Sequence, residues 1–357
     1  MAIDRTLEPG RRPIGLALLA ALLFGVTTPA AKTLLSVADP WLLAGLLYLG
    51  SGLGLGVARI AMRALGRTSR EAPLRRADVP WLAGAIACGG GIGPGLLMLG
   101  LAGSSASQAS LLLNLEGVLT ALLAWLVFRE HVDSRIAMGM GLITVGAVVL
   151  AWRPGAGLAL DRSALFVTAA CLAWAVDNNL TRRVSGGDAA LIAMLKGLVA
   201  GSVNLLIAVG SGAPWPSPRA ALVSGVVGLF GYGLSLVLFV RALRELGAAR
   251  TGAYFSTAPF LGTVLAILAL GEPVSGPLVV GGLLMAGGVW LHLSERHAHP
   301  HIHAPLAHEH LHAHDAHHDH THEPGAPAGE PHSHWHDHPA EGHTHRHYPD
   351  LHHGHPH

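Results

Sequence analysis

The sequence has few charged residues and little cysteine, and both absences narrow what the protein can be. Only 13% of its 357 residues are charged, whereas 51% are hydrophobic and the mean hydropathy is +0.45. A soluble domain carries about 25% charged residues, so this balance indicates a protein whose solvent is the bilayer. The two cysteines, Cys88 and Cys171, lie inside apolar stretches, which excludes a disulfide framework and a CxxC metal site.

Sequence motifs of catalysis are also lacking. The chain has no phosphate-binding loop, no nucleophile elbow and no HExxH pair. We therefore expect neither an enzyme nor an ATP-driven pump, no cofactor in the hydrophobic part and no nucleic-acid partner. The expected partners are the lipid bilayer and a small-molecule or metal-ion substrate, and a homodimer is left open.

Ten hydrophobic segments are long enough to cross a membrane. A helix needs about 20 mostly apolar residues to span ~30 Å of hydrocarbon, and continuous apolar runs of this length read as helices rather than barrel strands. The sequence thus predicts an all-α integral membrane protein with ten transmembrane helices. The segments are 13–35, 41–62, 80–101, 105–127, 136–152, 163–181, 188–210, 219–240, 251–270 and 276–293.

The basic residues predict how the chain is oriented, because cytoplasmic loops carry an excess of arginine and lysine. If residues 1–12 are a cytoplasmic N-terminal segment, most arginines fall in inside loops, among them Arg63, Arg76 and Arg183. Few basic residues, such as Lys32 and Arg162, fall outside. We expect a multi-pass inner (plasma) membrane protein with both termini in the cytoplasm.

Two halves of the chain, 13–152 and 163–293, follow the same pattern. At an offset of 142 positions, 128–130 aligns with 270–272, and a glycine-rich apolar span follows each. Gly89 and Gly91 align with Gly231 and Gly233 at the same offset. Five spans per half is an odd number, so the second half must be inverted relative to the first. Inverted repeats are typical of secondary transporters, whose substrate site lies near the midplane between the halves.

Short motifs within 13–293 resemble those of the EamA-like branch of the drug/metabolite transporter superfamily. They are the aromatic-small pairs Phe24-Gly25 and Trp174-Ala175, the glutamates Glu130 and Glu272, and Pro259. The first half departs from the family pattern, since it has Glu116-Gly117 where the family usually has a proline. The resemblance implies movement of small solutes by alternating access, commonly coupled to protons, and does not imply a particular substrate.

Glu116 is an ionisable side chain in the middle of a predicted span, close to Asn114. Placing a charge there costs at least about 2.5–3.5 kcal/mol, so it needs a partner or a purpose. Glu116 is a candidate proton-coupling carboxylate or cation ligand. The alternative is a carboxyl group that only binds a neighbouring helix.

Further polar residues lie in the second half. Asp177, Asn178 and Asn179 group oxygen ligands that suit a cation or the polar head of a metabolite, and they equally suit an interfacial cap. Lys196 either extends toward the exterior or pairs with Asp177 or Glu116.

The third span contains Pro94 and a run of glycines in 89–95. This composition predicts a break or kink that frees backbone carbonyls at the depth of a substrate, and it also allows close helix packing.

A histidine-rich tail, 294–357, follows the last span, and we expect it to be disordered and cytoplasmic. Its alternating histidines predict binding of divalent transition metal ions whose identity stays open. The predicted metal ligands are His297, His299, His301, His303, His308, His310, His312, His314, His332, His334, His336, His338, His343, His345 and His347.

The leading hypothesis is a secondary active transporter for a divalent transition metal (Ni, Co or Zn) or its complex. One alternative is an amino-acid or metabolite exporter with a metal-responsive regulatory tail. Another is a membrane metal sensor or storage scaffold that transports nothing.

Overall fold

A computed structural model describes the hydrophobic part of the chain in four stretches, 11–66, 71–128, 134–152 and 161–294. In the tail it describes 298–302, 306–312, 332–338 and 342–346. Several residues with sequence-based predictions lie outside the described residues, namely Glu130, His297, His303, His314 and His347.

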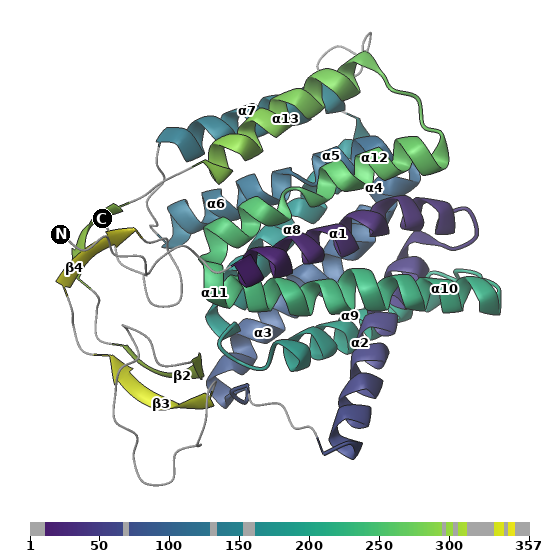
Figure 1. The fold of residues 1–357 in the computed structure, drawn as a ribbon. Helices are drawn as coiled ribbons and strands as arrows, with labels where there is room; N and C mark the ends of the chain where they lie inside the picture. Colours follow the sequence, from purple (N-terminus) through teal and green to yellow (C-terminus); the bar gives the residue numbers. More distant parts are fainter. Residues whose placement is uncertain are drawn as a thin grey trace.

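The hydrophobic part is a bundle of helices (Figure 1). Those of its first half are α1 (Arg11–Leu34), α2 (Pro40–Ala64), η1 (Arg76–Asp78), α3 (Val79–Ala85), η2 (Ile86–Ile92), α4 (Gly93–Ala102), α5 (Ala106–Leu112), α6 (Leu115–Phe128) and α7 (Ser134–Ala151). Those of its second half are α8 (Arg162–Val184), α9 (Ala189–Gly210), α10 (Pro218–Gly228), η3 (Leu229–Leu234), α11 (Ser235–Phe255), α12 (Ala258–Leu270) and α13 (Gly276–Leu293).

Within the described residues, nine helices are long and apolar enough to span a bilayer. The tenth predicted segment, 163–181, lies in α8, which has 23 residues and is thus about 34 Å long, but it is less apolar than the others. Polar residues lower its mean hydropathy. Two of them, Asp177 and Asn179, are only 8% and 6% exposed. Helix α8 packs against α3, η2, α4 and α6, so these side chains face protein rather than lipid.

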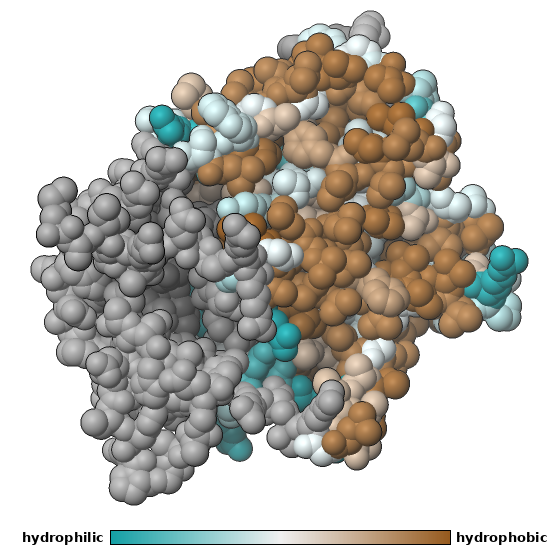
Figure 2. Space-filling model, in the orientation of Figure 1, coloured by the Kyte–Doolittle hydropathy of each residue, from teal (hydrophilic) through white to brown (hydrophobic). Residues whose placement is uncertain are grey.

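The outer surface of the bundle is suited to lipid. Large hydrophobic side chains project from it, with Leu268 76% and Leu206 72% exposed. Figure 2 shows a nearly continuous hydrophobic face over the helices, with hydrophilic residues gathered near its margins. A soluble protein rarely exposes so large an apolar surface. The chain is therefore a multi-pass membrane protein.

The third span of each half contains a π-helix, η2 in the first and η3 in the second. The predicted break at 89–95 is thus a widened turn, in which Gly93 N–H donates to Cys88 O, five residues back. Pro94 follows directly in the first turn of α4, where its missing N–H costs least. π-Helical turns are rare overall, but those that occur are frequently found at functional sites.

The fourth span of each half is interrupted. Leu113 and Asn114 separate α5 from α6, and Ser256 and Thr257 separate α11 from α12. Asn114 and Ser256 are 142 positions apart, the offset by which the sequences of the two halves align. The interruptions place backbone ends and polar side chains inside the bundle.

The described part of the tail has regular secondary structure. It contains four short strands, β1 (Ala298–Ile302), β2 (Leu306–His312), β3 (His332–His338) and β4 (Gly342–Arg346). Strand β1 pairs with β4 and β2 with β3, both antiparallel. The alternating His-x-His pattern has the period of two that an extended strand requires. The disorder expected of the tail as a whole stays a prediction.

Candidate functional site

A cavity lies inside the bundle, between helices of both halves. Its empty space is about 620 Å³, including its open mouth. Side chains from α1, α2, α6, α8, α9, η3 and α11 line it. A cavity of this size suits a small organic molecule.

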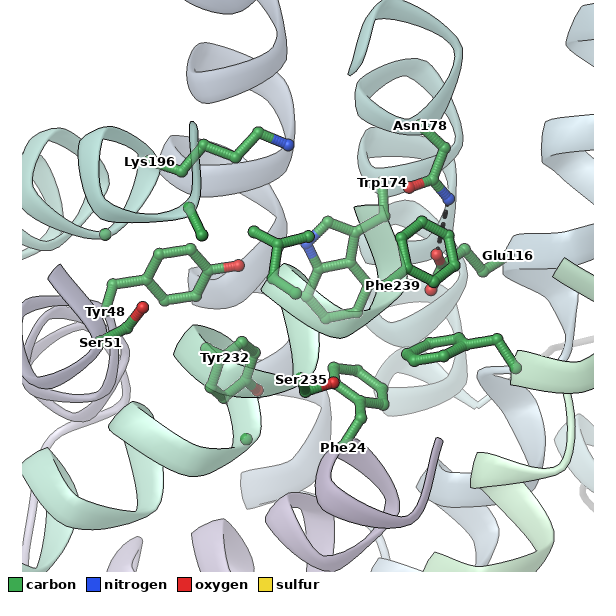
Figure 3. Close-up of a pocket in the computed structure, with 15 residues that line it drawn as sticks. Phe24, Tyr48, Ser51, Glu116, Trp174, Asn178, Lys196, Tyr232, Ser235 and Phe239 are labelled. Carbon is green, nitrogen blue, oxygen red and sulfur yellow. Dashed lines mark hydrogen bonds between the residues drawn. The ribbon is translucent and has the colours of Figure 1, made fainter. Parts of the chain in front are cut away.

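Six aromatic side chains line the cavity (Figure 3). They are Phe24, Tyr48, Trp174, Tyr232, Phe239 and Phe255. Phe24 is central, with ring centroids 6.2 Å from Trp174 and 5.7 Å from Tyr232 in edge-to-face geometry. The aromatic members of the two aromatic-small pairs, Phe24 and Trp174, thus meet here. Gly25 lets α1 approach α12, since a Cβ on it would lie 2.6 Å from Ala258 O.

The π-helix η2 supports this wall from behind. The carbonyl oxygen of Gly89 accepts hydrogen bonds from Trp174 Nε1 at 2.8 Å and from the Tyr48 hydroxyl at 3.3 Å. A side chain at Gly89 would collide with the Asp177 carboxylate. The glycine and the π-helical carbonyl thus fix the orientation of two aromatic rings.

Glu116 lies in the first turn of α6, just after the helix interruption, and its carboxyl group lines the cavity. Asn178 Nδ2 donates to Glu116 Oε1 at 2.7 Å (Figure 3). Among the described residues no basic side chain forms an ion pair with Glu116. Its carboxyl group therefore has a neutral amide as its hydrogen-bond partner.

Lys196 lines the cavity on another side, but its charge is already paired. Its Nζ donates to Asp177 Oδ1 at 2.5 Å and to Thr181 Oγ1 at 2.7 Å. The side chains of Lys196 and Asp177 are only 5% and 11% exposed. Asp177 stands behind Lys196 and does not line the cavity. From the sequence, either Asp177 or Glu116 could pair with Lys196, and the structure pairs Lys196 with Asp177.

The structure therefore brings together three of the sequence-predicted site residues, Glu116, Asn178 and Lys196, on the cavity wall. The others lie elsewhere. Asn114 donates to Leu111 O at the helix interruption, and Asn179 donates to Thr120 O and Ala175 O. Pro94 is buried at the start of α4.

Of the six aromatic residues in the wall, the sequence analysis singled out only Phe24 and Trp174, through the family resemblance. The available signal was position, since Tyr48, Tyr232 and Phe239 fall inside predicted spans. Aromatic residues make up only 5% of the chain, so those placed in mid-span stand out.

Glu272 does not line the cavity. Its carboxylate oxygens accept from Ala106 N at 2.6 Å and Ser107 N at 2.8 Å. These are the first N–H groups of α5, which lack partners within the helix and attract negative charge. Glu272 thus links the loop after α12 to the start of α5.

Known proteins resemble the chain over its whole helical part. The EamA-like transporter family matches residues 11–152 and again 161–294. An uncharacterized transporter of Methanothermobacter thermautotrophicus is 30% identical over 285 residues, covering 76% of this chain and 83% of that protein. The uncharacterized transporter YyaM of Bacillus subtilis is 22% identical over 207 residues, covering 54% and 66%.

One solved crystal structure superposes with a TM-score of 0.60 at 21% identity, covering 78% of this chain and 95% of that chain. At this identity the likeness concerns the fold alone. The family match extends over both halves, and the archaeal relative is similar along most of its length. The chain belongs to the EamA-like transporter family.

Proposed function

We propose that this membrane transporter is a secondary carrier that moves a small organic solute through the aromatic-lined cavity, with Glu116 as the proton-coupling group. The observation that carries the proposal is the Glu116 carboxyl group, which lines a cavity inside the bundle and has only Asn178 as a hydrogen-bond donor among the described residues. A carboxyl group in such a place can hold a proton in one step and release it in another.

The cavity favours an organic solute over a bare metal ion. A transition metal ion needs about four ligands from nitrogen, sulfur or oxygen donors. In the part of the chain that the structure describes, no three His, Cys, Asp or Glu side chains are grouped to hold one. The cavity wall contributes one carboxylate beside six aromatic rings, which is the composition of a pocket for an organic molecule.

Alternating access requires two halves that can exchange roles, and contacts between α7 and α13 support an inverted relation. Helices α7 and α13 lie side by side (Figure 1), and glycines lie at their contact. A Cβ on Gly139 would lie 2.8 Å from Gly288 O, and one on Gly146 would lie 2.8 Å from Gly281 O. Gly139 and Gly281 are 142 positions apart, as are Gly146 and Gly288. Such reciprocal contacts are what a pseudo-two-fold axis produces.

We further propose that the end of the bundle with the 71–76 loop faces the cytoplasm of a cell whose inner membrane holds the protein. Two ion pairs join the halves at this end, Arg59 with Asp188 at 2.6 Å and Arg241 with Glu71 at 3.0 Å. Their arginines belong to the excess of positive charge that marks cytoplasmic loops.

Metal transport is a second candidate, and the tail is the observation that favours it. The register places His308 opposite His336 and His310 opposite His334, so histidine positions face each other along β2 and β3. Metal binding by the tail remains a prediction. In this second function the tail supplies a metal ion, or a metal complex, to the carrier.

Transport in vesicles tests both candidates. The purified full chain is reconstituted with an imposed pH gradient, and proton movement is followed with an internal pH dye while amino acids, amines, organic acids or Zn²⁺, Ni²⁺ and Co²⁺ are added. We expect an organic solute to dissipate the gradient, and we expect Glu116→Gln to abolish this because glutamine cannot release a proton.

Two controls sharpen the vesicle experiment. Asp39→Asn also changes a carboxylate to an amide away from the cavity, keeps the cap of α2 and is expected to retain proton-coupled flux. A chain that ends at Leu293 is expected to transport the organic solute normally. If only metal ions move, and only with the tail present, the metal function replaces the proposed one. If Glu116→Gln transports as well as the wild type, the coupling role is wrong.

A further inference from the structure

We infer that the solute carried by this cavity is an organic cation, a substituted ammonium group attached to an apolar body, with Glu116 as its counter-charge. The inference rests on the proposed function and specifies its substrate class. Three features of the cavity lead to it: its charge balance, the engagement of its hydrogen-bond donors and the nature of its wall.

The charge balance of the cavity is negative. Among the described residues, its wall contains one acidic and one basic side chain, Glu116 and Lys196. Asp177 neutralises Lys196 from behind the wall, at 2.5 Å. Glu116 lacks a comparable basic partner among the described residues and is drawn on the opposite side of Figure 3 from Lys196. A carboxylate withdrawn from water is costly unless a cation pairs with it, so the missing partner is positive.

Four hydrogen-bond donors that line the cavity are already engaged by acceptors of the protein. Trp174 Nε1 donates to Gly89 O, and the Ser235 hydroxyl donates to Ala20 O at 2.9 Å. Lys196 Nζ donates to Asp177 and Thr181, and Asn178 Nδ2 donates to Glu116. An anionic solute would need donors of this kind for each of its oxygens. These four donors are therefore not free to bind a carboxylate or a phosphate.

The wall itself is suited to a cation without N–H groups. The face of an aromatic ring attracts a cationic group within about 6 Å, and the attraction grows when water is excluded. Phe24 connects the rings of Trp174, Tyr232 and Phe255, the last at 5.2 Å. Tyr48 and Tyr232 adjoin at 5.0 Å, which extends the aromatic surface from α1 to α2. The same rings give the apolar body of the solute its contact area.

Binding of three matched probes to the full-length protein in detergent micelles tests the inference. Phenethyltrimethylammonium is a permanent cation, phenylalanine is a zwitterion and 3-phenylpropionate is an anion, and all three carry a phenyl ring on a short chain. We expect isothermal titration to give the tightest binding for the cation and no binding for the anion. Glu116→Gln, which keeps an acceptor for Asn178, is expected to weaken cation binding about 10-fold or more, since about 1.4 kcal/mol corresponds to a factor of ten.

Two further variants keep the experiment decisive. Asp39→Asn is expected to bind the cation as the wild type does, because Asp39 caps α2 away from the cavity and asparagine keeps this cap. Phe24→Leu retains an apolar side chain but removes the central ring, so it should weaken the cation more than phenylalanine.

The outcomes separate this inference from the function on which it rests. Tighter binding of phenylalanine or 3-phenylpropionate than of the cation overturns the inference, as does unchanged cation binding by Glu116→Gln. If phenylalanine or the anion also dissipates a pH gradient in vesicles, the proposed carrier function stands without the cation preference. If no probe of any charge binds or moves, the proposed function fails as well.

Discussion

The buried pair of Asp177 and Lys196 gives the most direct test of how the bundle interior is built. We expect Asp177→Asn to lower the free energy of unfolding by about 3–5 kcal/mol, because it leaves a lysine charge without its counter-ion inside the protein. The 2.5 Å contact and the exposed fractions of 5% for Lys196 and 11% for Asp177 put the pair in the range where such a loss is large.

A double-mutant cycle measures how strongly Asp177 and Lys196 stabilise each other. Lys196→Met removes the charge that Asp177→Asn leaves behind, so the double variant should be more stable than Asp177→Asn alone. The coupling energy is expected to be about 2 kcal/mol, within the range for contacting residues. Unfolding of the full chain in mixed micelles with increasing SDS, followed by tryptophan fluorescence, measures each corner of the cycle.

A control and a refuting result complete this test. Asp39→Asn changes a carboxylate that caps α2, where asparagine caps equally well, and should alter stability by less than about 0.5 kcal/mol. If Asp177→Asn costs no more than this control, or if the two substitutions at the pair are additive, then Lys196 and Asp177 do not form the buried ion pair described above.

Two further predictions concern glycines. Gly89→Ala should lower the unfolding free energy by about 1–3 kcal/mol in the same assay, because its Cβ would collide with Asp177, whereas Gly91→Ala, whose nearest neighbour is Ile86 O at 3.8 Å, should be tolerated. Gly146→Ala should destabilise the packing of α7 on α13, and Gly141→Ala, with nothing within 4 Å of its Cβ, should be neutral or stabilise by up to about 1 kcal/mol. Equal effects within either pair would contradict the described packing.

Sequence reasoning predicted the membrane-spanning helices well because each depends on local hydrophobicity. It also anticipated an irregular third helix from Pro94 and its glycines, but not the π-helical form, which involves the hydrogen bonds of Trp174 and Asn204 to Gly89 and Gly90. The interruption at Leu113 and Asn114 was not predicted. Neither residue is a glycine or proline, and packing of side chains remote in sequence decides such a break.

The candidate site was predictable only where a residue is unusual for its depth. Glu116 and Lys196 stand out in apolar spans, and both line the cavity. Nothing in the sequence decides that Lys196 pairs with Asp177 rather than with Glu116, because helix rotation and packing determine which side chains meet. The aromatic wall depends in the same way on the meeting of α1, α2, η3 and α11, and no single segment contains it.

The pairing of Lys196 also bears on substrate charge. A buried ion pair is costly to bring into a membrane protein, and apolar residues would pack in its place. Here Asp177 neutralises a lysine that would otherwise compete with a cationic solute for Glu116. We therefore expect an Asp177→Asn variant that still folds to bind phenethyltrimethylammonium more weakly, and Asp177→Asn combined with Lys196→Met to recover most of the affinity. Isothermal titration of both variants measures this recovery. If the double variant binds the cation no better than Asp177→Asn alone, the lysine charge is not what opposes the solute.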